Sequence, residues 1–579
     1  MNSAAASAPA PTTPTVKLVA PITPVVSEVS VAALTIPGPL IVQSDRTVLL
    51  EVAHPLAADA RHDLAVFAEL ERAPEHIHTY RITKLGLWNA RAAGHTAEDM
   101  LAALEKYSKF PIPQNVSIDI TETVGRYGRL TIERDAEGVL TLTATDSAVL
   151  AEIARAKKIA NLLFERRGDT TFVIQPWARG ELKQELLKLG WPAEDLAGYT
   201  PGTPHEIDID TTGGFALRDY QNQAVKSFFD HGSGVVVLPC GAGKTLVGAG
   251  AMAISKTTTL ILVTNIVSAR QWRAELLRRT TLTEDDIGEY SGKAKEVRPV
   301  TIATYQILTA KRKGEYAHLQ LLDALDWGLV IYDEVHLLPA PVFKLTADLQ
   351  ARRRLGLTAT LVREDGREGD VFSLIGPKRF DAPWKEIEAQ GFISPASCYE
   401  VRIDLPQQER LEYAASADDV RYRLAATAPA KLDVVKKLVA KHPGELILVI
   451  GQYLDQIDEL AEALGAPQLT GSTPVDERER LYQNFRDGTT KILVVSKVAN
   501  FSVDLPEATV AIQVSGSFGS RQEEAQRLGR LLRPKESGLP AHFYTLVTRD
   551  TVDQDFAQNR QRFLAEQGYS YTILDAHAI

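Results

Sequence analysis

Cysteine is scarce in this sequence: Cys240 and Cys398 are the only two among 579 residues. Two cysteines exclude a disulfide framework and a cysteine zinc cluster, and their scarcity is typical of a reducing compartment. No apolar run approaches the roughly 18 residues that a membrane-spanning helix needs. The N-terminus lacks the basic segment and short apolar core of a secretory signal. We therefore predict a cytoplasmic protein without a membrane partner.

An excess of positive charge is also missing. The formal net charge is -10, from 64 Lys and Arg against 74 Asp and Glu. This average argues mildly against a nucleic-acid partner, because phosphate binding favours basic surfaces, but it leaves room for a local basic groove. The length indicates about three to four domains. Apolar content of 45% and charged content of 24% are those of a globular protein.

The N-terminal part of the chain contains three segments that differ in composition and apolar pattern. Residues 1–40 are rich in Ala, Pro, Thr and Val and are predicted to form a disordered tail. Residues 41–205 are predicted to form an α+β region, in which 149–166 have the apolar spacing of an amphipathic helix. Residues 198–214 are rich in Gly, Pro, Thr and Asp and indicate a linker. Strands are expected at 48–52, 116–120, 130–133 and 139–143.

After the linker, short apolar runs alternate with helix-length segments. Buried parallel strands in βαβ units give this pattern. A break separates two arrays, so we predict an α/β fold with two tandem parallel-sheet domains, at 206–400 and 431–579. Residues 401–430 are left as an inter-domain linker or a short thumb-like segment. The runs lie at 235–238, 260–263, 300–303, 329–332 and 355–357, and then at 446–450, 492–495, 510–514 and 543–546.

A glycine-rich segment after the first run carries the sharpest chemical signal. Backbone amides of such a loop, with the N-terminus of the following helix, can surround phosphate oxygens. Lys244 is expected to reach the β and γ phosphates of ATP, and Thr245 to bind Mg²⁺. Leu238 stands where the general pattern has glycine, and a turn beside a surface lysine is the alternative. The predicted loop contacts are Pro239, Cys240, Gly241, Ala242, Gly243, Lys244 and Thr245.

Two carboxylates and a distant arginine cluster complete the predicted site. Asp333 and Glu334 directly follow the run 329–332, and open parallel sheets bind ligands at the carboxyl ends of their strands. Asp333 suits the Mg²⁺ shell, and Glu334 suits the polarisation of an attacking water. Arg530 and Arg533 lie in the second array and are expected to enter the site as arginine fingers. The alternatives are an acidic helix cap and a basic helix face.

In this order the motifs resemble those of superfamily 2 helicases of the DExH type, over residues 215–570. The resemblance implies two RecA-like domains that share one ATP and Mg²⁺ site. Leu217-Arg-Asp-Tyr-Gln221 is similar to the adenine-reading element, which implies base contacts by Gln221 and Arg218. Thr358-Ala-Thr360 resembles motif III, which links the ATP state to the nucleic-acid site. Motif V is similar to residues 496–505 with Asp504, and motif VI begins at Gln526.

A second set of matches narrows the resemblance to the XPB branch in a prokaryotic form. Arg363, Glu364 and Asp365 follow motif III directly, as does the family's element implicated in duplex opening. A charged surface loop is the alternative. Similar sequence segments at 39–51, 374–378 and 562–569 extend the resemblance to nearly the whole chain after the tail. The family's segment before the first motor domain is proposed to recognise damaged DNA, and residues 171–200 are its expected counterpart.

The resemblance implies an ATP-dependent DNA helicase with 3′-to-5′ polarity that opens forked or damaged duplexes in DNA repair. Sequence-independent grips on the phosphate backbone are expected at 265–270, at Thr304 and Tyr305 and at Lys497, with base stacking by Tyr305 or Phe501. Two alternatives stay open. One is a double-strand translocase that does not release strands, and the other is a motor that works with a separate nuclease partner.

Overall fold

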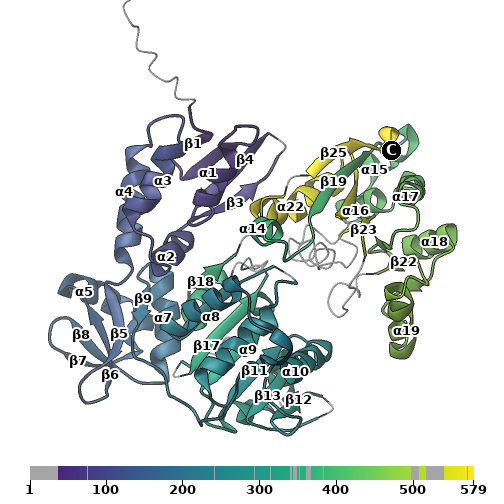
Figure 1. Cartoon of the computed structure of the whole chain (residues 1–579). Helices are drawn as coiled ribbons and strands as arrows, with labels where there is room; N and C mark the ends of the chain where they lie inside the picture. Colours follow the sequence, from purple (N-terminus) through teal and green to yellow (C-terminus); the bar gives the residue numbers. More distant parts are fainter. Residues whose placement is uncertain are drawn as a thin grey trace, which may run out of the picture. The chain divides into compact units, whose positions relative to one another are not determined.

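The computed structural model describes residues 37–579, with gaps at 75, 240, 293, 313–314, 340–341, 343–348, 351, 360, 362–366, 383, 497–507, 517–539 and 570. All elements below belong to the compact unit Gly38–Ile579 (Figure 1). The predicted disordered tail lies outside the described residues up to residue 36. Its predicted end at residue 40 is too late, because Leu40 already begins a strand.

The first N-terminal layer is an antiparallel sheet with the strand order β1-β2-β4-β3. The predicted strand at 48–52 is confirmed as β2. The apolar faces of the sheet and of four helices share one core. The elements are β1 (Leu40–Val42), β2 (Thr47–Glu51), β3 (Ala68–Arg72) and β4 (Ile77–Ile82), with α1 (Ala57–Leu64), α2 (Lys84–Ala92), α3 (Ala97–Tyr107) and α4 (Gln114–Arg126).

The strand predicted at 116–120 is wrong, because these residues lie inside α4. Val116, Ile120 and Val124 are buried and follow one another at steps of four, which is helical spacing. The five-residue window contained only the first two of them and fitted either period. Pro113 precedes the first turn, where its missing N–H costs nothing.

The second N-terminal sheet has the order β7-β8-β6-β5-β9. The predicted strands at 130–133 and 139–143 are confirmed. The predicted helix 149–166 is wrong in its second half: Ala156 leaves the helical region (ψ 113°), and β7 pairs antiparallel with β8. The elements are β5 (Leu130–Arg134), β6 (Leu140–Ala144), α5 (Ser147–Arg155), α6 (Lys157–Ala160), β7 (Leu163–Arg167), β8 (Thr171–Ile174), α7 (Ala178–Leu189) and β9 (Ala193–Asp195).

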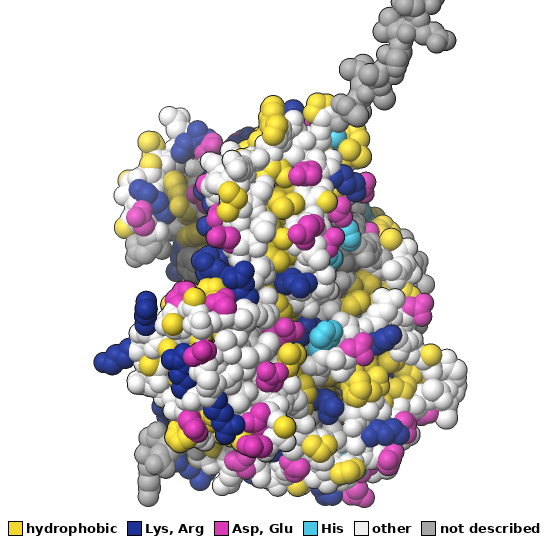
Figure 2. Space-filling view, turned by 90° about the vertical axis from the view of Figure 1, so that its left-hand side faces the viewer, with side chains coloured by type: hydrophobic (Ala, Val, Ile, Leu, Met, Phe, Trp, Pro, Cys, Tyr) yellow, Lys and Arg dark blue, Asp and Glu magenta, His cyan; other side chains and the backbone are white. Residues whose placement is uncertain are grey.

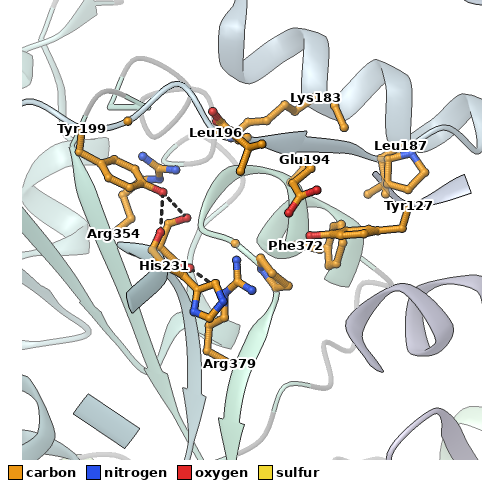
Figure 3. A pocket seen from close by; sticks show the side chains of 18 of the residues that line it. Tyr127, Lys183, Leu187, Glu194, Leu196, Tyr199, His231, Arg354, Phe372 and Arg379 are labelled. Carbon is orange, nitrogen blue, oxygen red and sulfur yellow. Dashed lines mark hydrogen bonds and ion pairs between the residues drawn. The ribbon is translucent and has the colours of Figure 1, made fainter. Parts of the chain in front are cut away.

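Irregular chain, predicted as the linker 198–214, joins this sheet to the next domain and packs along it. A cavity of about 260 Å³ lies at this junction (Figure 3). On one side of it Arg179 and Lys183 of α7 both pair with Asp195, at 2.6 and 2.7 Å. On the other, Tyr199 of the linker donates its hydroxyl hydrogen to Ser233 Oγ at 2.8 Å. The contact of Tyr199 with Ser233, the first residue of β10, ties the end of the N-terminal region to the first parallel sheet.

The first parallel-sheet domain is built on the strand order β12-β13-β11-β16-β17-β10-β18. All five apolar runs predicted for this domain are confirmed as strands. Each residue of β10, β11 and β13 is buried, as expected for strands covered on both faces. The strands are β10 (Ser233–Val237), β11 (Thr259–Val263), β12 (Ile287–Tyr290), β13 (Val300–Thr304), β16 (Leu329–Asp333), β17 (Arg353–Thr358) and β18 (Lys378–Asp381). The helices include α8 (Asp219–His231), α9 (Lys244–Ser255), α10 (Ile266–Arg279), α11 (Tyr305–Thr309) and α13 (Glu368–Leu374).

The second parallel-sheet domain has the order β21-β22-β20-β23-β24-β19-β25. The predicted fold class, two tandem parallel-sheet domains after an α+β region, is therefore confirmed. Its strands are β19 (Ala396–Ile403), β20 (Ile447–Ile450), β21 (Gln468–Leu469), β22 (Ile492–Val495), β23 (Val510–Gln513), β24 (Ala541–Thr548) and β25 (Tyr571–Asp575). Its helices include α15 (Gln407–Ala415), α16 (Asp418–Ala426), α17 (Ala430–Lys441), α18 (Leu454–Leu464), α19 (Val475–Arg486) and α22 (Val552–Glu566), and α14 (Trp384–Ala389) precedes β19.

The segment 401–430 differs from the predicted linker or thumb. β19 pairs in register with β24 over Ala396–Ile403, so the second sheet begins before residue 401, and α15 and α16 follow it. Polar residues interrupted the apolar pattern of this strand. Glu400 is nonetheless buried, because Arg402 and Gln561 both donate to its carboxylate.

Candidate active site

The glycine-rich loop runs from the end of β10 to the start of α9. Gly241 and Gly243 both take the left-handed conformation, with φ of 85° and 80°. A Cβ at Gly243 would lie 2.5 Å from Gln221 Nε2, so this position also needs glycine for space. Lys244 and Thr245 are the first two residues of α9. Their amides therefore lie at the unpaired N-terminal end of a helix, which attracts phosphate.

The start of α8 braces this loop. Gln221 is 1% exposed; its Nε2 donates to the Ala242 carbonyl at 2.9 Å, and its Oε1 accepts from the Arg218 amide at 2.9 Å. Tyr220 donates its hydroxyl hydrogen to the same carbonyl at 2.7 Å. The guanidinium of Arg218 lies over the Phe392 ring, 4.4 Å from its centroid. The side-chain amide of Gln221 is thus hydrogen-bonded to the loop, and Arg218 lies next to Gln221 over the Phe392 ring.

The two predicted carboxylates follow β16 and face the loop lysine. Lys244 Nζ lies 3.0 Å from Glu334 Oε1. The indole Nε1 of Trp272 donates to Asp333 Oδ2 at 3.0 Å. Glu334 has φ of 51° and ψ of 55°, a left-handed conformation that costs a non-glycine residue about 1 kcal/mol. Such strain in a residue that carries a charged group is typical of functional sites.

Burial and charge act on the two carboxyl groups in different ways. Burial, strengthened by the neighbouring charge of Glu334, raises the pKa of Asp333 to about 6. Burial also acts to raise the pKa of Glu334, but Lys244 and His336 outweigh it and hold that pKa below its ordinary value. Glu334 is therefore ionised at neutral pH.

These residues fit a bound Mg²⁺–nucleotide. Among the described residues, Lys244 and His336 are the cationic partners near two adjacent, largely buried carboxylates, so a divalent cation would relieve their repulsion. Glu334 Oε2 is buried and has no hydrogen-bond partner in the described part of the chain. A buried oxygen of this kind calls for a partner such as water.

A buried contact joins the carboxylate turn to the end of β17. His336 Nδ1 and Thr358 Oγ1 are 2.6 Å apart, and the two residues are 4% and 0% exposed. Thr358 lies in the segment expected to link the ATP state to the nucleic-acid site, and its described contact is with the ATP side. Thr358 is fully buried, and its predicted role toward the nucleic-acid site stays a prediction.

The predicted backbone grips at 265–270 and at Thr304 and Tyr305 lie where β11 and β13 end and α10 and α11 begin. The Asn265 side chain caps α10 by accepting from the Ser268 amide at 3.0 Å, and Arg270 is exposed. Thr304 and Tyr305 are 6% and 2% exposed. The predicted base stacking by Tyr305 is wrong for this structure, because its ring is buried and its hydroxyl donates to the Asp333 carbonyl at 2.8 Å.

Comparison with known proteins places the chain in one family. Residues 387–578 match the model described as ERCC3/RAD25/XPB C-terminal helicase, 214–363 the type III restriction enzyme res subunit, and 40–168 a helicase conserved C-terminal domain. A relative from Kineococcus radiotolerans, named DNA 3'-5' helicase XPB, is 66% identical over 94% of this chain and 97% of its own length. The chain belongs to the XPB helicase family.

Other relatives of the XPB family agree with this assignment. A Mycobacterium tuberculosis protein of the same name is 64% identical, over 93% of this chain and 98% of its own length. A Saccharomyces cerevisiae protein, named general transcription and DNA repair factor IIH helicase/translocase subunit XPB/SSL2, is 31% identical over 92% of this chain and 71% of its own length. The predicted resemblance is thus confirmed, and the chain is an ATP-hydrolysing helicase. No helix among its described residues is long and apolar enough to cross a membrane.

Several XPB-type residues predicted from sequence lie outside the described residues. They include the loop cysteine, the second motif III threonine, the three charged residues after motif III and every predicted site residue of the second domain. These are Cys240, Thr360, Arg363, Glu364, Asp365, Lys497, Phe501, Asp504, Gln526, Arg530 and Arg533. Their roles stay predictions.

Trp272 and Tyr220 were missed by the reading of the sequence. Ala269, Trp272 and Leu276 are all buried, at steps of three and four along α10, so the pattern marks Trp272 as an ordinary core residue. Nothing local shows that its N–H meets a carboxylate 61 positions further along the chain. Tyr220 had a weaker signal, its place inside the adenine-reading element.

Proposed function

We propose that this chain is an ATP- and Mg²⁺-dependent DNA helicase that moves with 3′-to-5′ polarity and opens duplexes. The proposed ATP hydrolysis is supported above all by the contact between Lys244 Nζ and Glu334 Oε1, which are 3.0 Å apart. This contact brings the predicted phosphate-binding lysine and the predicted general base of the sequence together. The DNA substrate and the polarity are supported by the names of the two bacterial relatives.

When bound, Mg²⁺–ATP supplies the phosphoryl group and the charge that hydrolysis removes. Lys244 binds the phosphate side, and Thr245 and Asp333 hold the metal. Glu334 is then released from Lys244 and accepts a hydrogen bond from the attacking water. In the adenine-reading element, Gln221 and Arg218 border the base, with the loop residues 239–243 around the phosphates.

The second domain supplies the remaining groups in this proposal. Arg530 and Arg533 would stabilise the charge on the transferred phosphoryl group, and the resemblance assigns Gln526 to the γ-phosphate region and Asp504 to the inter-domain ATP contacts. Because these arginines and Lys244 belong to different domains, nucleotide binding favours a closed pair of domains and hydrolysis favours an open one. Each closure moves one grip on the DNA relative to the other.

The catalytic assignment is tested by the variants Glu334→Gln and Lys244→Ala, with Lys226→Ala, an exposed lysine of α8, as the control. ATP hydrolysis is measured with and without forked DNA. We expect both site variants to lose DNA-stimulated turnover and the control to keep it. Wild-type turnover in Glu334→Gln would contradict the role of this residue as the general base.

A double-strand translocase that does not release strands is the second candidate. The two candidates differ in product, so a forked-duplex unwinding assay is run beside a triplex-displacement assay. Strand release from the fork supports the helicase, whereas triplex displacement alone supports the translocase. Arg363, Glu364 and Asp365 are the residues proposed to open the duplex, so their replacement is expected to reduce only the first assay.

The second N-terminal sheet is proposed to contact forked or damaged DNA, which would place the helicase in repair. Phe164 of β7 is 69% exposed and Trp177, just before α7, is 60% exposed. Exposed aromatic rings can stack on unpaired bases. Basic side chains accompany them: those of Lys158 and Arg166 are 78% and 54% exposed. Figure 2 views the side where β5–β8 lie, and there Lys and Arg side chains are interspersed with hydrophobic, acidic and other ones.

Replacement of Phe164 and Trp177 by serine tests this contact, with Phe110→Ser as the matched control. Phe110 is 59% exposed but belongs to the segment between α3 and α4. We expect weaker binding of forked DNA in the first pair of variants only. Equal binding by all three variants would remove this surface from the proposal.

A separate nuclease partner and a cytoplasmic location also stay proposals. The described residues hold no group of three or more His, Cys, Asp or Glu side chains that could bind a metal ion. Cleavage of DNA by the purified chain alone would therefore show that a nuclease centre lies elsewhere in it. Cleavage that appears only with a second protein would support the partner.

A further inference from the structure

Asp333 receives hydrogen bonds from two helices. Trp272 of α10 donates its indole N–H to the carboxylate Oδ2 at 3.0 Å, and Tyr305 of α11 donates its hydroxyl hydrogen to the backbone carbonyl at 2.8 Å. Both donors are 2% exposed. The carboxyl group proposed to hold Mg²⁺ is therefore positioned by side chains that are themselves fixed by packing, as a precise metal site requires.

The two helices that supply these donors are tied together at their N-terminal ends. Gln306 of α11 donates its side-chain N–H to the Thr264 carbonyl, just before α10. Thr264 Oγ1 and Ser268 Oγ are 3.3 Å apart, and the Asn265 side chain caps the same helix. The starts of α10 and α11 thus form one hydrogen-bonded unit. It is the unit that the sequence predicts to grip the phosphate backbone.

Trp272 also touches the helix of the phosphate loop. A Cβ at Gly248 of α9 would lie 2.5 Å from the Trp272 ring, so ring and helix are in close contact. A bulkier residue at Gly248 would push the ring from its place. The indole is therefore held between α9 and β16, with its N–H aimed at Asp333. A small displacement of α10 along this contact changes the hydrogen bond, since hydrogen-bond strength falls steeply with misalignment.

We propose that DNA bound at the starts of α10 and α11 sets the position of Asp333 through Trp272 and Tyr305, and so tightens Mg²⁺–nucleotide binding and accelerates hydrolysis. This inference rests on the proposed function above. Trp272 and Tyr305 are positioning residues, because they act on the metal through Asp333. The path is separate from the His336–Thr358 contact, which reaches the carboxylate turn from β17.

The test uses variants that keep an aromatic ring and remove the donor: Trp272→Phe, in which the ring is smaller, and Tyr305→Phe. The structure offers matched controls in the same domain. Trp327 is 0% exposed and donates its indole N–H to the Leu321 carbonyl at 3.0 Å, so Trp327→Phe loses an equivalent bond away from Asp333. Tyr290→Phe loses a hydroxyl contact with His318 Nδ1 at 3.0 Å. Thermal unfolding of all four shows whether each variant is folded.

The first readout is binding of a fluorescent ADP analogue without DNA, once with Mg²⁺ and once with EDTA. We expect Trp272→Phe to lose about tenfold of the affinity that Mg²⁺ adds, because a hydrogen bond to a charged group is removed. Its affinity in EDTA stays that of the wild type. Trp327→Phe and Tyr290→Phe keep the full Mg²⁺ increment. A general packing defect would instead lower both affinities.

The second readout is the fold stimulation of ATP hydrolysis by single-stranded DNA. We expect lower stimulation in Trp272→Phe and Tyr305→Phe, and in the double variant a loss smaller than the sum of the two single losses, as for residues on one path. If Trp272→Phe matches Trp327→Phe in both readouts, the inference is overturned. If wild-type hydrolysis ignores DNA, the proposed function fails, while the Mg²⁺ increment still decides whether Trp272 positions Asp333.

Discussion

Each parallel-sheet domain contains a lysine that pairs with a carboxylate. In the first domain the side chains of Lys244 and Glu334 are 12% and 21% exposed, and Glu334 has a left-handed backbone and a buried oxygen without a hydrogen-bond partner among the described residues. In the second domain the side chains of Lys431 and Asp553 are 1% and 0% exposed. Lys431 Nζ donates to Asp553 Oδ2 and to the Val514 and Leu546 carbonyls, so all three of its hydrogens have acceptors.

The two pairs therefore serve different purposes. A buried pair with satisfied donors ties elements together: Lys431 joins α17 to the ends of β23 and β24 and to the start of α22. A strained pair that solvent can reach can exchange its partners for a ligand. Exposure and backbone strain separate the two cases better than the presence of an ion pair does, whereas each pair includes one buried carboxylate oxygen without a hydrogen-bond partner among the described residues, Glu334 Oε2 and Asp553 Oδ1. The predictions below test this difference.

The largest expected effect is on turnover. Glu334→Gln keeps the shape of the side chain but removes the base, so kcat for DNA-stimulated hydrolysis is expected to fall by about 10²–10⁴-fold. The unfolding temperature should not fall, because no fully buried charge loses its partner. Steady-state ATPase assays and a thermal melt on the same preparation measure both. A large drop in melting temperature would show that the pair in the first domain is structural as well.

The second domain should respond in the opposite way. Lys431→Met leaves Asp553 buried with Arg560, at 3.6 Å, as its remaining cationic partner among the described residues, and is expected to cost about 3 kcal/mol or more of stability. Amide hydrogen exchange of β24 measures this loss. Lys437→Met, at an exposed position of the same helix, is the control and should change little. If Lys431→Met melts like the control but hydrolyses ATP poorly, the contrast between the two pairs is wrong.

Acid should reduce the stability that Asp553, Lys431 and Arg560 give to the second domain. Burial would raise the pKa of Asp553, but Lys431 and Arg560 outweigh it and lower that pKa below its ordinary value. A carboxyl group with a lowered pKa stabilises the fold above its unfolded-state pKa of about 3.9, and this contribution is lost as the pH falls through the lower folded-state value. Hydrogen exchange of β24 at pH 5, 4 and 3 should therefore show the wild type approaching Asp553→Asn only below pH 4.

The sequence predicted the parts of the molecule in which local pattern and burial agree. The apolar runs of β10 and β11 were recognised because strands buried on both faces need no polar alternation. β19 was missed because Glu400 and Arg402 interrupt its pattern, and only the partners of Glu400 in the folded state explain its burial. Lys244, Asp333 and Glu334 could be named from motifs.

Their supports could not be named, since these depend on which helix packs where. Trp272 and Tyr305 lie 61 and 28 positions before Asp333 along the chain. Its helical spacing marks Trp272 as a core residue, and Tyr305 was predicted to contact nucleic acid instead. The same holds for Lys431 and Asp553, which are 122 positions apart. No local spacing encodes such pairs, because each pair forms only when the sheet of its own domain has assembled.

The smallest expected effect isolates the strain at Glu334. Glu334→Ala and Glu334→Gly both remove the carboxylate and its contact with Lys244, so both should abolish hydrolysis. They differ in the cost of φ 51°, which glycine adopts without a Cβ clash and alanine does not. Glu334→Gly is therefore expected to be more stable than Glu334→Ala by about 1 kcal/mol, reduced by the larger entropy of glycine in the unfolded chain. Hydrogen exchange of β16 measures the difference. Equal stability of the two variants would mean that the turn relaxes once the carboxylate is gone, and that the strain is imposed by the ion pair rather than by the backbone around it.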